Sequence, residues 1–221
     1  MNSVTDVSPE TTDAYPGGVS APSTVESPAV PSADTAWPAM LTWAGDSVAM
    51  LESARVQMSS RAIKVHGRIV AGRTETFESF SVSYDLLLDE WGVTRRLSMR
   101  STVARGDRQV SLSRNSEGFW LIDHGQGPRS AEFGGAKDVD VVLSSLFATL
   151  PIRRLQLHEQ YRNETVTIVA VSLPELTVQP AEYSFRSSPT GVEVASPAGD
   201  ALIAVDGDGF ALDYAGITHR I

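Results

Sequence analysis

The stretch "FSVSYDLLL" (residues 80–88) places an apolar side chain at every second position. Successive side chains of a β-strand point to opposite faces of a sheet, so this alternation predicts a strand with one buried face. The intervening Ser81, Ser83 and Asp85 would lie on the other face. The buried face would carry Phe80, Val82, Tyr84, Leu86 and Leu88.

The same alternation continues on both sides of this stretch. Leu97, Met99 and Val103 alternate with polar residues, and so do Val110 and Leu112. Short turn signals such as "ARGDR" at 104–108 and "DGDG" at 206–209 separate the runs. Many short strands joined by tight turns indicate a mainly β, antiparallel meander, closed or half-closed. Further strands are predicted at 48–58, 62–71, 164–172, 182–187, 191–196, 201–205 and 209–215.

Helix signals are scarce and concentrate in one place. Residues 144–150 are the best candidate, with Ser144 or Ser145 as the N-cap and Pro151 ending the helix after one or two turns. This helix would be an insertion into an otherwise all-β pattern.

Residues 1–36 differ in composition from the rest of the chain. They are rich in Pro, Ser, Thr and Ala, and they carry five acids with no Lys or Arg. Such a segment buries too little apolar surface to offset its ordering entropy, so we predict a disordered arm, with a phosphorylatable regulatory tail as the alternative. Residues 37–221 are then predicted to form a single β domain.

The chain carries 27 acids and 18 basic residues, a formal charge of −9, of which residues 1–36 contribute −5. The remaining −4 belongs to a nearly balanced domain. This charge distribution gives no basic footprint for nucleic acid and disfavours binding to anionic membrane surfaces. We therefore expect no nucleic-acid partner, and the sequence leaves the oligomeric state open.

The chain contains no cysteine, and its four histidines are scattered singly without a metal-ligand spacing. We therefore expect no metal, no cofactor and no catalytic thiol. The N-terminal residues lack the basic and apolar parts of a secretory signal, and no window approaches the roughly 18 apolar residues of a membrane span. The expectation is a cytoplasmic protein without stable membrane insertion.

Two acids and two arginines flank the predicted helix. Asp138 and Asp140 would share one face of a strand about 7 Å apart, and such a pair could act as acid and base, as in glycosidases. Acids near arginines more often form structural ion pairs. On an extended segment only one of Arg153 and Arg154 would point inward. That arginine would either clamp an aspartate or bind an anionic ligand headgroup.

The stretch "DVDVVLSSLFATLPIRRL" (138–155) resembles the core motif of the bacterial putative glycolipid-binding family. Asp138, Asp140 and residues 149–155 carry the match, and the resemblance spans roughly residues 41–185. Where the family has Pro-x-Thr-Asn, this chain reads "SLFA" at 145–148, which makes the insertion more apolar. Residues elsewhere that follow the family's order are Trp43, Glu52, Tyr84, Asp85, Arg95, Gly118 and Trp120.

The resemblance implies an antiparallel half-barrel or incomplete barrel with one or two short helices. It also implies non-catalytic binding of a glycolipid or similar amphiphile, similar to bacterial lipoprotein carriers that hold acyl chains in a concave apolar face. That face would include Phe80, Val82, Tyr84, Leu97 and Met99. The residues expected at the ligand are Arg153, Arg154, Asp138, Asp140, Trp43, Glu52, Tyr84 and Trp120.

Two other functions remain open at this point. In the first, the protein is a structural or interaction domain whose Asp–Arg clamp only locks the fold, and the acidic arm recruits a partner. In the second, it is a hydrolase that uses Asp138 or Asp140 on a sugar or an ester. Inspection of a structure for a cavity beside Arg153 and Arg154 is the most informative test of these hypotheses.

Overall fold

The structure, a computed structural model, describes residues 37–221, and the arm predicted at 1–36 lies outside this range. The described residues form one mostly antiparallel sheet of fifteen strands. The first eight are β1 (Ala39–Gly45), β2 (Met50–Met58), β3 (Ala62–Ala71), β4 (Phe80–Asp89), β5 (Thr94–Val103), β6 (Gly106–Arg114), β7 (Trp120–Asp123) and β8 (Arg129–Ala131). The other seven are β9 (Asp138–Val141), β10 (Asn163–Ser172), β11 (Thr177–Ser188), β12 (Gly191–Ser196), β13 (Gly199–Val205), β14 (Ala211–Tyr214) and β15 (Thr218–Arg220).

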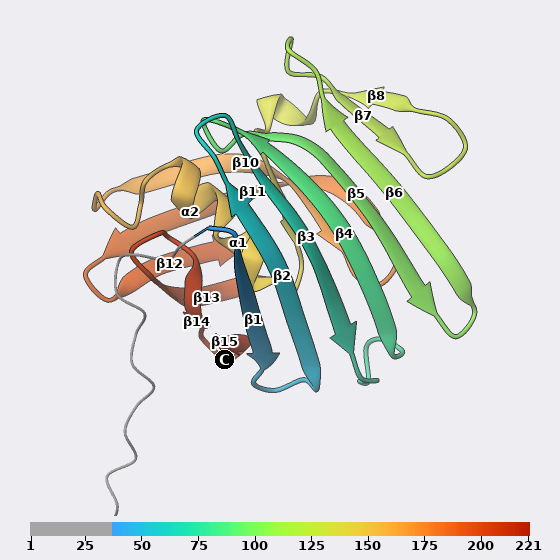
Figure 1. Ribbon diagram of the computed structural model, residues 1–221, viewed down its shortest axis with the longest axis horizontal. Helices are drawn as coiled ribbons and strands as arrows, with labels where there is room; N and C mark the ends of the chain where they lie inside the picture. The colour runs from blue at the N-terminus through green and yellow to red at the C-terminus, as the bar shows by residue number, and fades with distance from the viewer. Residues whose placement is uncertain (1–36) are drawn as a thin grey trace, which may run out of the picture. The chain divides into compact units, whose positions relative to one another are not determined.

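The spatial order of the strands is β8-β7-β6-β5-β4-β3-β2-β1-β15-β14-β13-β12-β11-β10-β9. The sheet stays open, with β8 and β9 as its two edges, and β9 runs parallel to β10. Figure 1 shows β2–β6 side by side in front, with β10 and β11 passing behind them and β12 and β13 at the left. The pairing of β1 with β15 joins these two parts of the sheet. The predicted class, a mainly β meander that forms an incomplete barrel, is confirmed.

Strand β4 shows how the sequence builds this sheet. All five of its predicted apolar positions are buried, while Ser81, Ser83 and Asp85 are half-buried or exposed. Tyr84 pairs with Gly67 on β3 and with Met99 on β5. A Cβ atom at Gly67 would collide with the Tyr84 ring, so the glycine lets the ring lie flat against β3.

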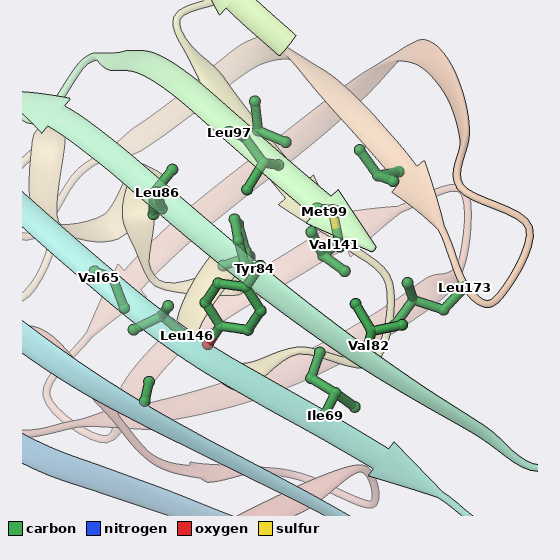
Figure 2. Packing of buried hydrophobic residues seen from close by; sticks show 14 of the residues in the cluster. Val65, Ile69, Val82, Tyr84, Leu86, Leu97, Met99, Val141, Leu146 and Leu173 are labelled. Carbon is green, nitrogen blue, oxygen red and sulfur yellow. The ribbon is translucent and has the colours of Figure 1, made fainter. Parts of the chain in front are cut away.

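The main apolar core lies between the front strands and the segments behind them. Figure 2 shows Ile69, Tyr84 and Leu97 from β3–β5 on the same side as Leu146 and Val141. Leu146 and Phe147 belong to α1 (Ser145–Ala148), and both are fully buried. A second cluster, with Ile152, Tyr183 and Phe185, packs on β10–β13. The helical insertion therefore fills the concave side of the sheet.

The helical insertion differs in part from the prediction. Ser144 caps α1, its hydroxyl accepting a hydrogen bond from Phe147 N at 3.2 Å, as expected. The prediction that Pro151 ends the helix is wrong, because Pro151 lies in the first turn of a second helix, α2 (Leu150–Arg154). A proline in the first turn loses no hydrogen bond, since that N–H has no helical partner. A short 3₁₀ turn, η1 (Phe133–Gly135), precedes β9.

Several short strands were not predicted. β7, β8 and β15 have only three or four residues each, too few to show an alternation. β1 was also missed, although its Leu41 and Trp43 are buried at alternate positions. β11 begins at Thr177, earlier than the predicted start at residue 182. The sequence did not indicate this first half because it is largely exposed and contains Pro180.

Candidate functional site

Asp138 and Arg154 form a buried ion pair between β9 and α2. Arg154 Nε donates to both carboxylate oxygens of Asp138, at 2.8 and 3.0 Å, and Nη2 donates to Oδ2 at 2.6 Å. The Asp138 side chain is fully buried and that of Arg154 is 12% exposed. Burial raises the pKa of Asp138, and the hydrogen bonds from Arg154 oppose that shift. The clamp considered from the sequence therefore exists, with Arg154 as its cation.

Asp140 lies on the same strand but has a different partner. The hydroxyl of Tyr183 on β11 donates to Asp140 Oδ2 at 2.8 Å. Asp140 Oδ1 is buried without a hydrogen-bond partner among residues 37–221. Burial raises the pKa of Asp140 to about 6. Asp138 and Asp140 are thus held apart by separate partners.

Glu52 connects the front of the sheet to the insertion. Its Oε1 accepts from Tyr84 Oη at 2.8 Å and from Ser144 Oγ at 2.6 Å, and Leu146 N lies 3.4 Å from Oε2. The residue is fully buried, and burial raises its pKa. This carboxylate ties β2 and β4 to the N-terminus of α1.

Two predicted tryptophans donate to the backbone. Trp43 Nε1 donates to Ala211 O at 2.8 Å, and Trp120 Nε1 donates to Ala136 O at 3.0 Å. Both indole rings are fully buried. The two tryptophans therefore anchor neighbouring segments, and no surface of either ring is open to a ligand in this structure.

Arg153 differs from the other candidates. The expectation that Arg153 and Arg154 lie on an extended segment is wrong, because both belong to α2. Arg153 Cζ lies 4.1 Å from the centroid of the Phe210 ring, and Nη2 lies 3.1 Å from Met58 Sδ. Its Nε and Nη1 atoms are buried and have no hydrogen-bond partner within 37–221. Burial lowers the pKa of Arg153, and Asp208 and Asp206 oppose that shift.

Two further basic side chains, Arg220 and His158, lie at the turn that carries Phe210, and no sequence pattern indicated either. Arg220 Nη1 donates to Asp206 Oδ2 at 2.6 Å, while its Nε and Nη2 find no partner in the described part of the chain. His158 Nδ1 is also buried without a partner there. A Cβ atom on Gly209, at φ +78, would lie 3.0 Å from both Arg153 Cγ and His158 Nδ1. Arg153, His158 and Arg220 are called the cationic cluster below.

Gly209 is the sequence feature that could have drawn attention to this turn. The hairpin turn predicted at "DGDG" (206–209) is confirmed, since β13 and β14 pair on either side of it. Asp206 fixes this turn, since its Oδ1 accepts from Asp208 N and Phe210 N at 3.0 and 2.9 Å, and its Oδ2 accepts from Arg220 Nη1. No spacing rule connects this turn with residues 153 and 158, which lie some fifty residues earlier in the chain.

The apolar face expected to hold acyl chains is covered by the chain itself. Phe80, Tyr84 and Met99 are at most 3% exposed. The insertion lies against this face, and the Tyr84 and Phe147 rings meet edge-on with centroids 5.0 Å apart. The expected open concave face is therefore not present in this structure.

Comparison with known proteins agrees with this fold. A family model described as putative glycolipid-binding matches residues 40–220. A crystal structure of a DUF1089 family protein from Pseudomonas aeruginosa is similar, with a TM-score of 0.63 at 20% sequence identity, covering 77% of this chain and 92% of that chain. No curated protein matches the chain. No helix within 37–221 is long and apolar enough to cross a membrane. Since the family model spans most of its length, the chain belongs to the putative glycolipid-binding family.

Proposed function

We propose that this protein binds an amphiphile of the glycolipid type without chemical conversion, and that the ligand's polar head lies at the cationic cluster. The observation that carries the proposal is the set of buried guanidinium nitrogen atoms on Arg153 and Arg220 that lack partners within 37–221, with His158 Nδ1 beside them. A buried donor without an acceptor costs about 1–3 kcal/mol, and more when it is charged. Hydroxyl, carboxylate or phosphate oxygens of a headgroup would supply the missing acceptors.

One aromatic side chain beside the cluster, Trp37, is placed to meet a sugar head. The rings of Trp37 and Phe210 lie 5.5 Å apart between centroids, and Arg153 stacks on Phe210. Trp37 is half-buried, whereas Phe210 is 1% exposed and lies under Arg153. Carbohydrate recognition combines an apolar ring face with directed polar groups; here Trp37 would supply the first and the cationic cluster the second.

The hydrocarbon part of the ligand would compete with the insertion. Leu146 and Phe147 occupy the apolar side of β4 and β5, so a chain enters only if α1 moves. Arg153 lies on α2, which follows α1 directly in the sequence. A head bound at Arg153 would therefore act on the same insertion that covers the apolar face.

Native mass spectrometry and organic extraction of the protein purified from its own host test this proposal. We expect a retained amphiphile in the wild-type protein and its loss from R153M, which keeps the length and apolar stem of the side chain. R186M is the matched control, because Arg186 is exposed and pairs only with Glu193 on the surface. Equal retention by R153M and R186M, or no amphiphile in the wild type, contradicts the proposal.

A purely structural or interaction role is the second candidate. It is favoured by the Asp138–Arg154 clamp and by Glu52, whose partners all come from the chain itself. In that case deletion of residues 1–36 abolishes capture of a partner in pull-down experiments, and no amphiphile is recovered.

The hydrolase hypothesis finds less support in this geometry. Both oxygens of Asp138 accept hydrogen bonds from Arg154, and Asp140 is 7% exposed. A general acid or base must reach substrate; Asp138 is enclosed by Arg154, and Asp140 is buried beside Tyr183. We therefore keep the non-catalytic proposal. Cytoplasmic localisation remains a prediction that cell fractionation would test.

A further inference from the structure

One outer face of the sheet carries a concentration of basic residues. Side chains on β2–β5 that point away from the core include Arg55, Lys64, His66, Arg68, Arg96 and Arg100, all exposed. In the strand register, Lys64 and Arg96 lie on either side of Leu87. In the same way, Arg68 and Arg100 lie on either side of Ser83. These six residues are called the basic face.

Two acids lie among these cations, and each has its own partner. Asp107 on β6 accepts from Arg100 Nη2 at 2.5 Å, and Asp85 pairs with His66. Arg55, Lys64, Arg68 and Arg96 have no ion-pair partner in the part of the chain that the structure describes. Five Lys and Arg against two acids leave this face with a formal charge of +3, whereas residues 37–221 as a whole carry −4.

The basic face contains two shallow hollows between the cations. One, of about 350 Å³, is lined by Lys64, His66, Leu87 and Arg96 among others. The other, of about 290 Å³, is lined by Arg68, by Arg100 with its partner Asp107, and by the hydroxyl residues Ser81, Ser83 and Thr102. Arginine, lysine and hydroxyl groups are the side chains that bind phosphate oxygens.

Exposed aliphatic side chains continue the same face. Leu51 on β2 and Val70 on β3 are cross-strand partners, 44% and 47% exposed, and Met40 on β1 is 62% exposed. The exposed aromatic residues Trp91, Phe119 and Tyr161 lie in loops outside β1–β6. Aromatic platforms mark single-stranded nucleic-acid sites, whereas cations beside exposed aliphatic groups mark membrane surfaces.

We propose that the basic face docks on a bilayer that contains anionic phospholipid, with Arg55, Lys64, Arg68 and Arg96 against the headgroups and Leu51 and Val70 at the interface. This inference is independent of the cationic cluster and of any ligand bound there. The expectation from net charge alone, that anionic membranes are disfavoured, treats the charge as evenly spread. Salt screens charges that are more than about a Debye length of 10 Å from the bilayer, so the charge of the face turned toward it matters more than the net charge of the whole protein.

Vesicle flotation of the full chain tests the proposal. The vesicles contain phosphatidylcholine alone or with roughly one third phosphatidylglycerol, and the salt is varied from about 20 to about 300 mM. We expect binding only to the anionic vesicles, weakening as the salt rises. Replacing Lys64, Arg68 and Arg96 together by serine should weaken binding roughly 100-fold, since each basic residue near an anionic surface contributes a factor of roughly five.

The control variant removes three exposed arginines elsewhere, R105S/R129S/R186S, so that the net charge changes equally. It should retain wild-type binding, and circular dichroism establishes that both variants are folded. L51S/V70S should reduce binding without changing its salt dependence. Absence of wild-type binding at low salt, or equal losses in the two triple variants, overturns the proposal. Binding of heparin or single-stranded DNA without binding of vesicles overturns it as well, and so does self-association through this face that excludes the vesicles.

Discussion

At the residue scale, the acids of the family motif and of β2 are all buried, and each depends on a small number of donors. Glu52 depends on Tyr84 and Ser144, Asp138 on Arg154, and Asp140 on Tyr183. A buried carboxylate that loses a donor has no water to replace it. These contacts therefore predict large effects from small substitutions.

Removing the Tyr84 hydroxyl is the first such test. Y84F leaves the ring in place and takes one of two hydroxyl donors from Glu52, so we expect a loss of about 1–3 kcal/mol in the free energy of unfolding. Urea denaturation measures this change. Y161F is the control, because Tyr161 is 65% exposed and its hydroxyl can bond to water. If the two variants are equally stable, the Glu52 network does not stabilise the fold.

Asp140 predicts a pH dependence of stability. Its pKa in the folded protein is about 6, above the ordinary value of 3.8, so the folded state holds this proton more tightly than the unfolded state does. Stability should therefore fall as the pH rises from about 4 to about 6 and stay reduced above that range. The difference between these two pKa values corresponds to about 3 kcal/mol in the free energy of unfolding.

The comparison of wild type with D140N isolates this effect. The pKa values of Glu52 and Asp138 are also raised. Both residues titrate in both proteins, so their contributions cancel when the two free energies of unfolding are subtracted. D140N should gain stability relative to the wild type between about pH 4 and 6, measured by denaturant unfolding at each pH. Parallel stability curves for the two proteins would show that Asp140 does not titrate in this range.

At the scale of elements, the insertion α1–α2 is held at both ends. The Ser144 cap and Glu52 fix the start of α1, and the Asp138–Arg154 pair fixes the end of α2 to β9. Leu146, Phe147 and Ile152 between them are fully buried. The apolar side chains supply the driving force for packing the insertion, while the polar contacts determine its position.

A double-mutant cycle on the clamp tests this division. R154M leaves Asp138 as an unpaired buried acid and should destabilise the protein by about 3–5 kcal/mol. D138N/R154M removes the uncompensated charge, so its loss should be smaller than the sum of the two single losses. Denaturant unfolding of the four proteins provides the coupling energy. Additive losses would mean that the two side chains do not depend on each other.

At the scale of the whole described domain, the sheet depends on one long-range junction. β15, at the C-terminal end, pairs with β1 near the start of the described residues and with β14. The junction is extended by hydrogen bonds from Ile221 N to Thr42 O and from Asp46 N to Ile217 O, both 3.0 Å. Without this strand the two parts of the sheet would each gain an unpaired edge.

Removing residues 217–221 should therefore abolish cooperative unfolding or lower the transition midpoint strongly. I221S is the control, because its side chain is 69% exposed and its backbone pairing is kept. Circular dichroism followed through a urea titration distinguishes the two. A truncated protein with the wild-type midpoint would show that β15 does not contribute to the stability of the sheet.

The sequence by itself determined the class of fold and the position of the insertion. Alternation in 80–88 and its neighbours is a local property, because each strand shows its buried face in its own residues. The motif at 138–155 likewise placed the family, and the comparison with the family model agrees. The sequence also predicted an Asp–Arg clamp as one of two uses of the arginines, but it did not choose between Asp138 and Asp140 or between Arg153 and Arg154.

Only the tertiary structure decided how these side chains are used. Arg153 meets Phe210 and Gly209, and the four cations of the basic face that have no ion-pair partner within 37–221 come from three different strands. Such neighbours are set by strand register and by the path of the sheet, which no local pattern encodes. The tertiary structure also decided that the apolar face is filled by the chain itself. Leu146 and Phe147 are buried because the insertion reaches this surface of the curved sheet, and that position depends on the path of the whole chain.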